Sequence, residues 1–157
     1  EVNLLVTLHD LPVSVSHFST LIEQEVTRWK RKNNKIAEIL LEWQTDTPDI
    51  EKLGIFAAGL RAHLKLDYWI GLGLRRGWFE ADPAQAEWLL TRPDGIRSYV
   101  YSIDEAQQDN ETLEQTLAAL DKIGIPFLVK TRRLPPARQG VSLREAYPLF
   151  GGFVAVY

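Results

Sequence analysis

Residues 36–44 read IAEILLEWQ, and this stretch decides the fold class. Its apolar run, residues 39–41, has no polar interruption, which is typical of a strand buried on both faces in a parallel sheet. Directly after the run come Glu42, Trp43 and Gln44. Successive side chains of a strand point to opposite faces, so Glu42 and Gln44 share one face and Trp43 lies on the other. Enzymes built on parallel strands gather their chemistry at the carboxyl ends of the strands, which makes this end a candidate site.

Composition indicates one globular domain over residues 1–157. Of the 157 residues, 45% are hydrophobic and 10% aromatic, enough for a sizeable core. The net charge of −3 and the pI near 5.6 argue against a nucleic-acid partner. The densest basic cluster, Lys30-Arg31-Lys32, falls at the end of an expected helix, where cations interact favourably with the helix dipole. We therefore interpret it as a solvated helix end and expect no nucleic-acid binding.

Cysteine is absent, which excludes disulfides and thiolate metal sites. The three histidines have no metal-ligand spacing, so neither a metal nor a cofactor is expected. The apolar stretch at residues 2–8 is far too short to cross a bilayer, so we expect no membrane span in this chain. Because methionine is also absent, we expect the native protein to extend upstream of Glu1.

Strand-like and helix-like segments alternate along the chain. Strands are expected at residues 2–9, 36–44, 68–74, 96–103, 126–131 and 152–157. Helices are expected to begin near Ser16, Asp49, Asp82, Asn110 and Ser142. Alternation with short connections predicts an α/β fold with a largely parallel sheet and right-handed crossovers.

Two architectures are compatible with this alternation: a parallel (β/α) barrel and an open doubly wound sheet. The strands favour the barrel, because one parity of each strand is apolar and the other is mixed. In the third strand, for example, Tyr68 and Ile70 belong to the apolar set, whereas Trp69 and Gly71 belong to the mixed set. A complete barrel takes about 250 residues, and about six strands are found here, so we expect a partial or incomplete TIM barrel.

A series of weak motifs follows these elements in order between residues 4 and 132. They are His9-Asp10 after the first strand, Trp29 late in the first helix, Glu42-Trp43-Gln44, Phe56 and Leu60 in the second helix, Trp78, Tyr101 and Pro126-Phe127. In this order and spacing the chain resembles an uncharacterised bacterial family of TIM-barrel, glycoside-hydrolase-like proteins. The resemblance implies a carbohydrate-associated activity and a periplasmic or secreted location. It also implies an acid on each side of the aromatic residue, and here Gln44 replaces the outer acid.

The replacement weakens the case for catalysis. A glycosidase generally needs a proton donor and a second carboxylate, roughly 5 Å apart for retention or about 6.5–9.5 Å apart for inversion. Glu42 is the candidate for one role and Asp46 for the other, since Gln44 cannot protonate a leaving group. Other carboxylates that could complete the pair are Asp10, Asp104 and Glu105. The alternative is structural: Asp46 would stabilise a turn, and Glu42 would form a salt bridge with Arg75 or Lys130.

Aromatic and basic side chains extend the candidate site. Trp78 and Tyr101 follow or end strands and could stack on a sugar ring, although core packing is the commoner role of an aromatic residue. Trp29 lies on an apolar helix stripe and is expected in the core. Basic residues after the fifth strand could hold a carboxylated or acetylated sugar, or could neutralise Glu42. The ligand-binding candidates are therefore Gln44, Arg75, Trp78, Tyr101, Lys130, Arg132 and His9.

Three function hypotheses follow from these residues. The leading one is a carbohydrate-associated domain that binds a polysaccharide or oligosaccharide, or a degenerate glycoside hydrolase, at the strand carboxyl ends. The second is an active glycoside hydrolase that uses Glu42 with a second carboxylate. The third is a non-catalytic structural or protein-interaction domain, because fold does not fix function.

Overall fold

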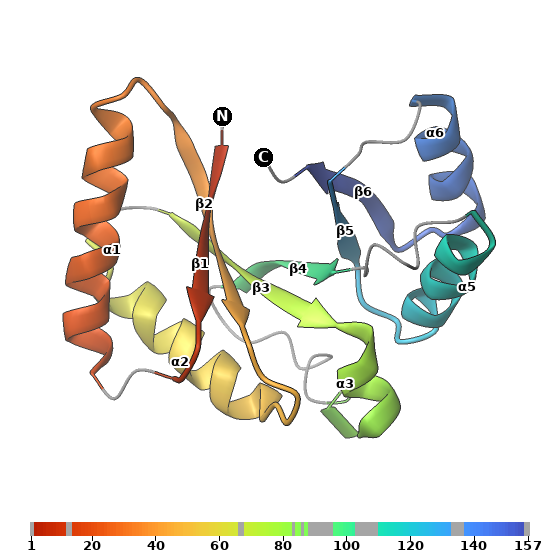
Figure 1. The fold of residues 1–157 in the computed structure, drawn as a ribbon, viewed down its shortest axis with the longest axis horizontal. Coiled ribbons are helices and arrows are strands. Elements are labelled where there is room, and N and C mark those ends of the chain that lie inside the picture. Colours follow the sequence, from red (N-terminus) through yellow and green to blue (C-terminus); the bar gives the residue numbers. More distant parts are fainter. Residues whose placement is uncertain are drawn as a thin grey trace. The chain divides into compact units, whose positions relative to one another are not determined.

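The structure is a computed structural model that describes residues 2–11, 14–65, 68–82, 84–85, 87, 96–102, 110–132 and 137–155. In these residues, strands and helices alternate, and the strands form one parallel sheet in the order β1-β2-β3-β4-β5-β6 (Figure 1). The strands are β1 (Val2–Leu8), β2 (Ile36–Trp43), β3 (Trp69–Arg75), β4 (Ile96–Ser102), β5 (Phe127–Thr131) and β6 (Phe150–Ala155). The helices are α1 (Val15–Lys30), α2 (Ile50–His63), α3 (Arg76–Ala81), α5 (Asn110–Asp121) and α6 (Ala137–Ala146).

The predicted α/β class and parallel sheet are confirmed. Within the described residues the sheet is open, because β1 and β6 stand at the two ends of the strand order and are not paired with each other. An open sheet fits the doubly wound alternative as well, so closure into a barrel stays a prediction. In the part of the chain described above, no helix combines the length and hydrophobicity needed to cross a membrane.

The chain divides into two compact units, and the division passes through β3 and β4. Unit 1 comprises Glu1–Leu72 and Thr91–Arg97, and unit 2 comprises Gly73–Leu90 and Ser98–Tyr157. Each unit is described by itself, and the prediction of a single domain stays a prediction.

In unit 1, the register of β1 and β2 gives the shared faces that the sequence parity predicts. On one face the paired residues are Leu4 with Ile39, Val6 with Leu41 and Leu8 with Trp43. On the other face they are Asn3 with Glu38, Leu5 with Leu40 and Thr7 with Glu42. We call the first face the core face because Ile39 and Leu41 are completely buried; on the second face Leu40 and Glu42 of β2 are buried as well, while Asn3 and Thr7 of β1 are exposed.

Helices α1 and α2 lie on the same side of β1 and β2 and pack against each other (Figure 1). Their contact includes Phe18 and Phe56, whose ring centroids are 5.5 Å apart. The hydroxyl of Ser14 caps α1 by accepting a hydrogen bond from the backbone N–H of His17 at 3.2 Å. The expected cap at Ser16 is therefore wrong by two residues, because an N-cap side chain must reach an amide of the first turn and Ser16 is already inside the helix.

The ends of the helices in unit 1 otherwise follow local sequence signals. The carboxylate of Asp49 caps α2 as predicted, accepting from the backbone N–H of Lys52 at 3.0 Å. Asn33 stops the turn after α1 with a φ of 61°, a left-handed conformation that asparagine tolerates better than most residues.

Unit 2 is held together by a chain of aromatic contacts. Phe79 of α3, Tyr101 of β4 and Phe127 of β5 follow each other with ring centroids 5.8 and 5.7 Å apart. The series of aromatic contacts continues into β6: the Phe127 and Phe150 ring centroids are 5.8 Å apart, and those of Phe150 and Phe153 are 4.9 Å apart. These tilted and edge-to-face pairs bury a large apolar area in a small unit. They link α3 and the three short strands β4, β5 and β6 in one aromatic core.

Some expected elements of unit 2 differ from the observed ones. Helix α3 was not expected, and α6 begins at Ala137, so Ser142 lies inside the helix instead of capping it. The last strand begins at Phe150, two residues before the expected start. Most of the helix expected after Asp82, with residues 103–109 and 133–136, lies outside the described residues.

Candidate functional site

The β1–β2 corner, which we define as Thr7, His9, Glu42 and Gln44, lies at the carboxyl ends of two neighbouring strands in unit 1. Thr7 and Glu42 are register partners on the face opposite the core. The backbone N–H of Gln44 donates to the carbonyl oxygen of Leu8 at 2.8 Å, which continues the parallel ladder beyond the end of β2. The continued ladder brings the backbone of Gln44 next to the end of β1, so His9 and Gln44 follow Leu8 and Trp43 directly at neighbouring strand ends.

The corner becomes more exposed towards its end. Glu42 is only 7% exposed, whereas His9, Gln44 and Asp46 are exposed. Glu42, Gln44 and Asp46 each have interaction partners. A carboxylate therefore lies at the base of the corner, with an imidazole and an amide at its open end. Such a set offers both hydrogen-bond donors and acceptors to a polar ligand.

Burial alone does not distinguish Glu42 as functional. Glu38 lies on the same face of β2, four residues earlier, and is 8% exposed. It also has an interaction partner. The two residues share type, face and burial, and they differ in position: only Glu42 stands at the carboxyl end of the strand, where the loops that bind ligands begin.

The remaining candidates belong to unit 2. Trp78 of α3 is 4% exposed and Tyr101 of β4 is 1% exposed. A stacking platform needs an open ring face, and neither ring offers one in this structure, so their proposed contact with a sugar stays a prediction without structural support. Lys130 is the register partner of Ser102 and is half-buried, while Arg132 beyond the end of β5 is exposed.

Burial raises the pKa of the Tyr101 phenol far above its ordinary value, and the neighbouring Tyr99 raises it further. The cause is the loss of water around the phenolate form. Tyr101 thus behaves as a neutral core residue with ring contacts to Phe79 and Phe127. This favours the packing role that the sequence left open for Tyr101.

The predicted salt bridge from Glu42 to Arg75 or Lys130 would join the two units. Glu42 lies in unit 1, and Arg75 and Lys130 lie in unit 2. All three residues have interaction partners. The bridge itself stays a prediction. Of the other carboxylates considered, Asp10 is exposed beside the corner in unit 1, and Asp104 and Glu105 fall outside the described residues.

No group of three or more histidine or carboxylate side chains suited to a metal ion exists among the residues that the structure describes. The exposed His9, Asp10 and Asp46 therefore do not form such a group with Glu42.

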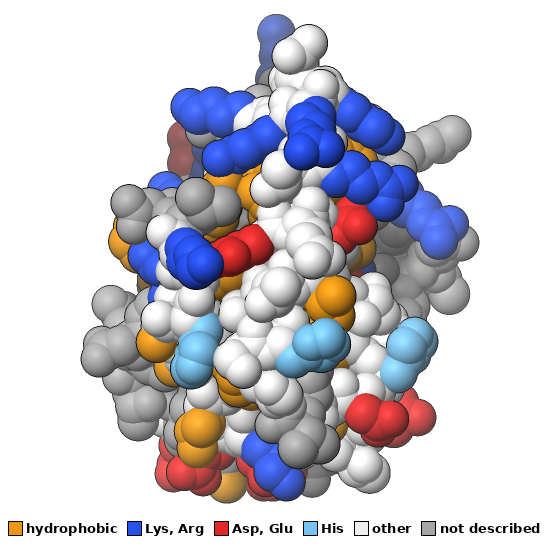
Figure 2. All heavy atoms as spheres, turned by 90° about the vertical axis from the view of Figure 1, so that its left-hand side faces the viewer, with side chains coloured by type: hydrophobic (Ala, Val, Ile, Leu, Met, Phe, Trp, Pro, Cys, Tyr) orange, Lys and Arg blue, Asp and Glu red, His pale blue; other side chains and the backbone are white. Residues whose placement is uncertain are grey.

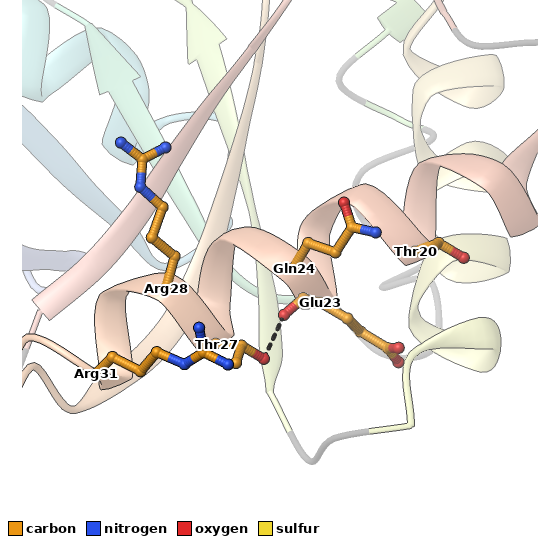
Figure 3. Close-up of a pocket in the computed structure, with 6 residues that line it drawn as sticks. All are labelled: Thr20, Glu23, Gln24, Thr27, Arg28 and Arg31. Atoms are coloured by element: carbon orange, nitrogen blue, oxygen red, sulfur yellow. Dashed lines mark hydrogen bonds between the residues drawn. The ribbon is translucent and has the colours of Figure 1, made fainter.

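A shallow hollow of about 380 Å³ runs along α1 and was not expected from the sequence (Figure 3). The described residues that line it are Thr20, Glu23, Gln24, Thr27, Arg28 and Arg31. Ligand pockets are lined mostly by hydrophobic and aromatic side chains, whereas every residue that lines this hollow is polar or charged. Thr27 uses its hydroxyl within the helix, donating to the carbonyl oxygen of Glu23 at 2.8 Å. The hollow therefore favours solvent more than a small ligand.

Comparison with known proteins assigns the chain neither to a family nor to a function. No protein-family model matches the chain, and no curated protein and no solved structure matches it at a significant level. The resemblance to glycoside-hydrolase-like barrels stays a prediction from the sequence motifs.

Proposed function

We propose that this chain is a carbohydrate-associated, barrel-like domain that binds a glycan at the β1–β2 corner and has lost full hydrolytic activity. The observation that carries the proposal is the register that pairs Thr7 with Glu42 and leads on to His9 and Gln44. It gathers a hydroxyl, a carboxylate, an imidazole and an amide at the carboxyl ends of two neighbouring parallel strands, where α/β proteins bind ligands.

The chemistry of the corner suits sugar hydroxyls better than bond cleavage. A sugar ring offers hydroxyls that both donate and accept hydrogen bonds. The carboxylate of Glu42 can accept from such hydroxyls, and the amide of Gln44 can both donate and accept. Hydrolysis needs a second carboxylate as well. Gln44 occupies the position next to Glu42 on the same face, and an amide cannot supply a proton to a leaving group.

The strand order supports the barrel-like part of the proposal. Doubly wound sheets reverse their strand order at a switch point, where the ligand binds. Here the order runs from β1 to β6 without reversal, as it does around a barrel. A periplasmic or secreted location is proposed from the resemblance alone.

An active glycoside hydrolase is the second candidate. Asp46 favours it, because this exposed carboxylate follows Gln44 by two residues in the same unit. In that case Glu42 and Asp46 would be the two acids, and both would be needed for turnover.

The matched pair Glu42→Gln and Glu38→Gln tests the proposal. Each change removes one buried carboxylate from the same face of β2. Binding to a glycan array should be lost in Glu42→Gln and kept in Glu38→Gln, with both variants folded by circular dichroism. Equal binding by both variants would place the site elsewhere. If the natural chain binds no glycan, the glycan-binding proposal is wrong, and the structural or protein-interaction role is the remaining hypothesis.

Release of reducing sugar from any glycan that binds distinguishes the two candidates. The binding proposal expects no release by the natural chain above that of Glu42→Gln. Release that is abolished by both Glu42→Gln and Asp46→Asn would establish the active hydrolase instead.

A further inference from the structure

A second surface of unit 1 carries a strong local positive charge. Five of the eight residues from Arg28 to Lys35 are basic and none is acidic, although the whole chain has a net charge of −3. These residues form the last turn of α1 and the loop to β2, and their side chains are exposed apart from that of the half-buried Asn34. Arg28 pairs with Glu25 at 3.2 Å. The other basic residues of the run are Lys30, Arg31, Lys32 and Lys35.

Two exposed tryptophans accompany this charge. Trp29, expected in the core, is 41% exposed in the last turn of α1, so that expectation is wrong. Trp69 at the start of β3 is 48% exposed. The contact of Lys30 with the ring of Tyr68, at 5.0 Å, places the end of α1 next to the start of β3. Both tryptophans therefore lie at the same end of unit 1, the amino end of its strands.

Each of these tryptophans carries a cation over its ring. The ammonium of Lys32 is 6.0 Å from the Trp29 centroid, and the guanidinium of Arg97 is 5.5 Å from the Trp69 centroid. We call the surface made by Lys30, Arg31, Lys32 and Arg97 with Trp29 and Trp69 the basic end of unit 1. It combines positive charge with amphipathic rings.

The charge is polarised along unit 1. Asp10, Asp46, Asp49 and Glu51 are exposed at the carboxyl ends of β1 and β2 and in the first turn of α2. Figure 2 shows most Lys and Arg side chains of the face that carries α1 gathered at one end, with some Asp and Glu side chains beside them, and further Asp and Glu side chains together with Lys or Arg at the opposite end. A negatively charged surface would therefore attract the basic end and repel the other, which orients the unit.

We propose that the basic end of unit 1 binds the surface of an anionic lipid membrane. Basic clusters gain binding energy next to anionic lipids, and tryptophan prefers the level of the lipid headgroups. A lysine or arginine placed over a tryptophan presents both groups together, so the cation meets a lipid phosphate while the ring enters the headgroup layer. This surface is separate from the β1–β2 corner and does not depend on the glycan proposal.

A membrane fits the geometry better than a single-stranded nucleic acid. Such nucleic acids bind by stacking bases on open aromatic faces along a groove. Here a cation covers one face of each ring, and the charged groups are collected at one end of the unit instead of along a track. Trp69 follows Tyr68 by one residue, so the Arg97–Trp69 pair lies on the opposite face of the sheet from Lys30 and α1, and a membrane would meet the two pairs end-on at the amino ends of the strands.

Sedimentation with lipid vesicles tests the proposal on the full chain. Vesicles of phosphatidylcholine mixed with phosphatidylglycerol should carry the protein down at low salt, and vesicles of phosphatidylcholine alone should not. High salt should release it, because counter-ions screen the attraction. Quenching of tryptophan fluorescence by brominated lipid in the mixed vesicles should be strong in the natural chain and weak in Trp29→Ala/Trp69→Ala.

Two charge-matched variants locate the surface. Each basic side chain near an anionic surface contributes roughly fivefold to binding, so Arg31→Gln/Lys32→Gln should bind about 25-fold more weakly. Lys52→Gln/Lys122→Gln removes the same charge from exposed residues on other elements and should bind like the natural chain. Circular dichroism checks that both variants are folded.

Three results would overturn the proposal: no binding to the mixed vesicles, equal loss in the two charge variants, or unquenched tryptophans in bound protein. Binding to a single-stranded oligonucleotide in place of vesicles would assign the surface to nucleic acid instead. A glycan-array result, positive or negative, leaves this proposal unaffected.

Discussion

Thr7 of β1 lies directly beside Glu42 of β2 in the parallel register, on the face of the sheet opposite the core. Thr7 is exposed and Glu42 is 7% exposed. Because position 7 is open, it can be given a charged side chain. The effect of that charge on stability then reports whether position 7 lies beside the carboxylate of Glu42. The same arrangement recurs earlier on the two strands, where the exposed Asn3 is the partner of Glu38.

Charge at position 7 should therefore change stability with a sign that depends on Glu42. Thr7→Lys should unfold at higher urea than Thr7→Glu, by about 0.2–1 kcal/mol in the free energy of unfolding, because adjacent opposite charges attract and like charges repel. Lysine and glutamate are similarly poor strand formers, so the difference isolates the charge. The difference should shrink in the Glu42→Gln background. If it persists unchanged there, the two side chains do not meet.

Gly152 and Gly140 should respond oppositely to alanine. Between the register pairs Phe127–Phe150 and Val129–Phe153, β6 has two residues where β5 has one, which forms a β-bulge. Gly152 sits in it with a φ of +129°, which L side chains rarely adopt; the approach of an added Cβ to Nη2 of Arg144, 2.5 Å, can be relieved by moving that flexible side chain. Gly152→Ala should therefore lower the free energy of unfolding by about 1–3 kcal/mol.

Gly140 is the matched control for this bulge. It lies inside α6, and an added Cβ would meet no atom within 4 Å. Gly140→Ala should raise the free energy of unfolding by about 0.5–1 kcal/mol, because glycine has more conformational freedom to lose in a helix. Urea titration of both variants checks the pair. A Gly152→Ala variant as stable as the natural chain would show that the bulge has another conformation.

Removal of the cap at Asp49 should destabilise α2. The carboxylate accepts from the backbone N–H of Lys52, which would otherwise lack a partner at the start of the helix. Asp49→Ala should lower the free energy of unfolding by about 1 kcal/mol, whereas Asp49→Asn should keep most of it, since asparagine caps about as well. Thermal unfolding followed by circular dichroism measures both. Equal losses in the two variants would mean that charge, and not the capping hydrogen bond, stabilises this end.

Tyr101 should make the protein less stable in alkaline solution. Burial raises its pKa in the folded state, so above the ordinary tyrosine value of about 10 the unfolded chain loses a proton that the folded chain keeps. The folded state then binds more protons, and the free energy of unfolding falls as the pH rises through this range. Tyr101→Phe should reduce this fall.

Urea unfolding near neutral pH and above pH 10 measures the difference for Tyr101→Phe and for a control, Tyr147→Phe. The half-buried Tyr147 at the end of α6 controls for the loss of a phenol hydroxyl elsewhere in the unit. An alkaline decline in Tyr101→Phe as steep as in the natural chain would contradict the assignment of the effect to Tyr101.

The sequence by itself determined the alternation of strands and helices and the two faces of each strand. Apolar runs such as residues 39–41 can be stable only when buried, and side chains alternate with a fixed period of two, so the partition of Leu4 and Ile39 from Thr7 and Glu42 follows from local rules. The helix cap at Asp49 is equally local, because donor and acceptor are three residues apart.

Tertiary structure decided which residues neighbour each other across strands and which tryptophans remain in water. The register that sets Thr7 beside Glu42 depends on packing between elements far apart in the sequence. Trp29 lies on an apolar stripe and is nevertheless exposed, because an apolar stripe is buried only where another element covers it. Tyr101 and Trp78 are candidate ligand platforms in the sequence but are buried in the structure. The Tyr101 ring is enclosed by Phe79 and Phe127, which belong to other elements. The periodicity of a segment indicates on which face of a strand or helix a side chain lies. Whether that face is buried depends on contacts with other segments, which no single segment contains.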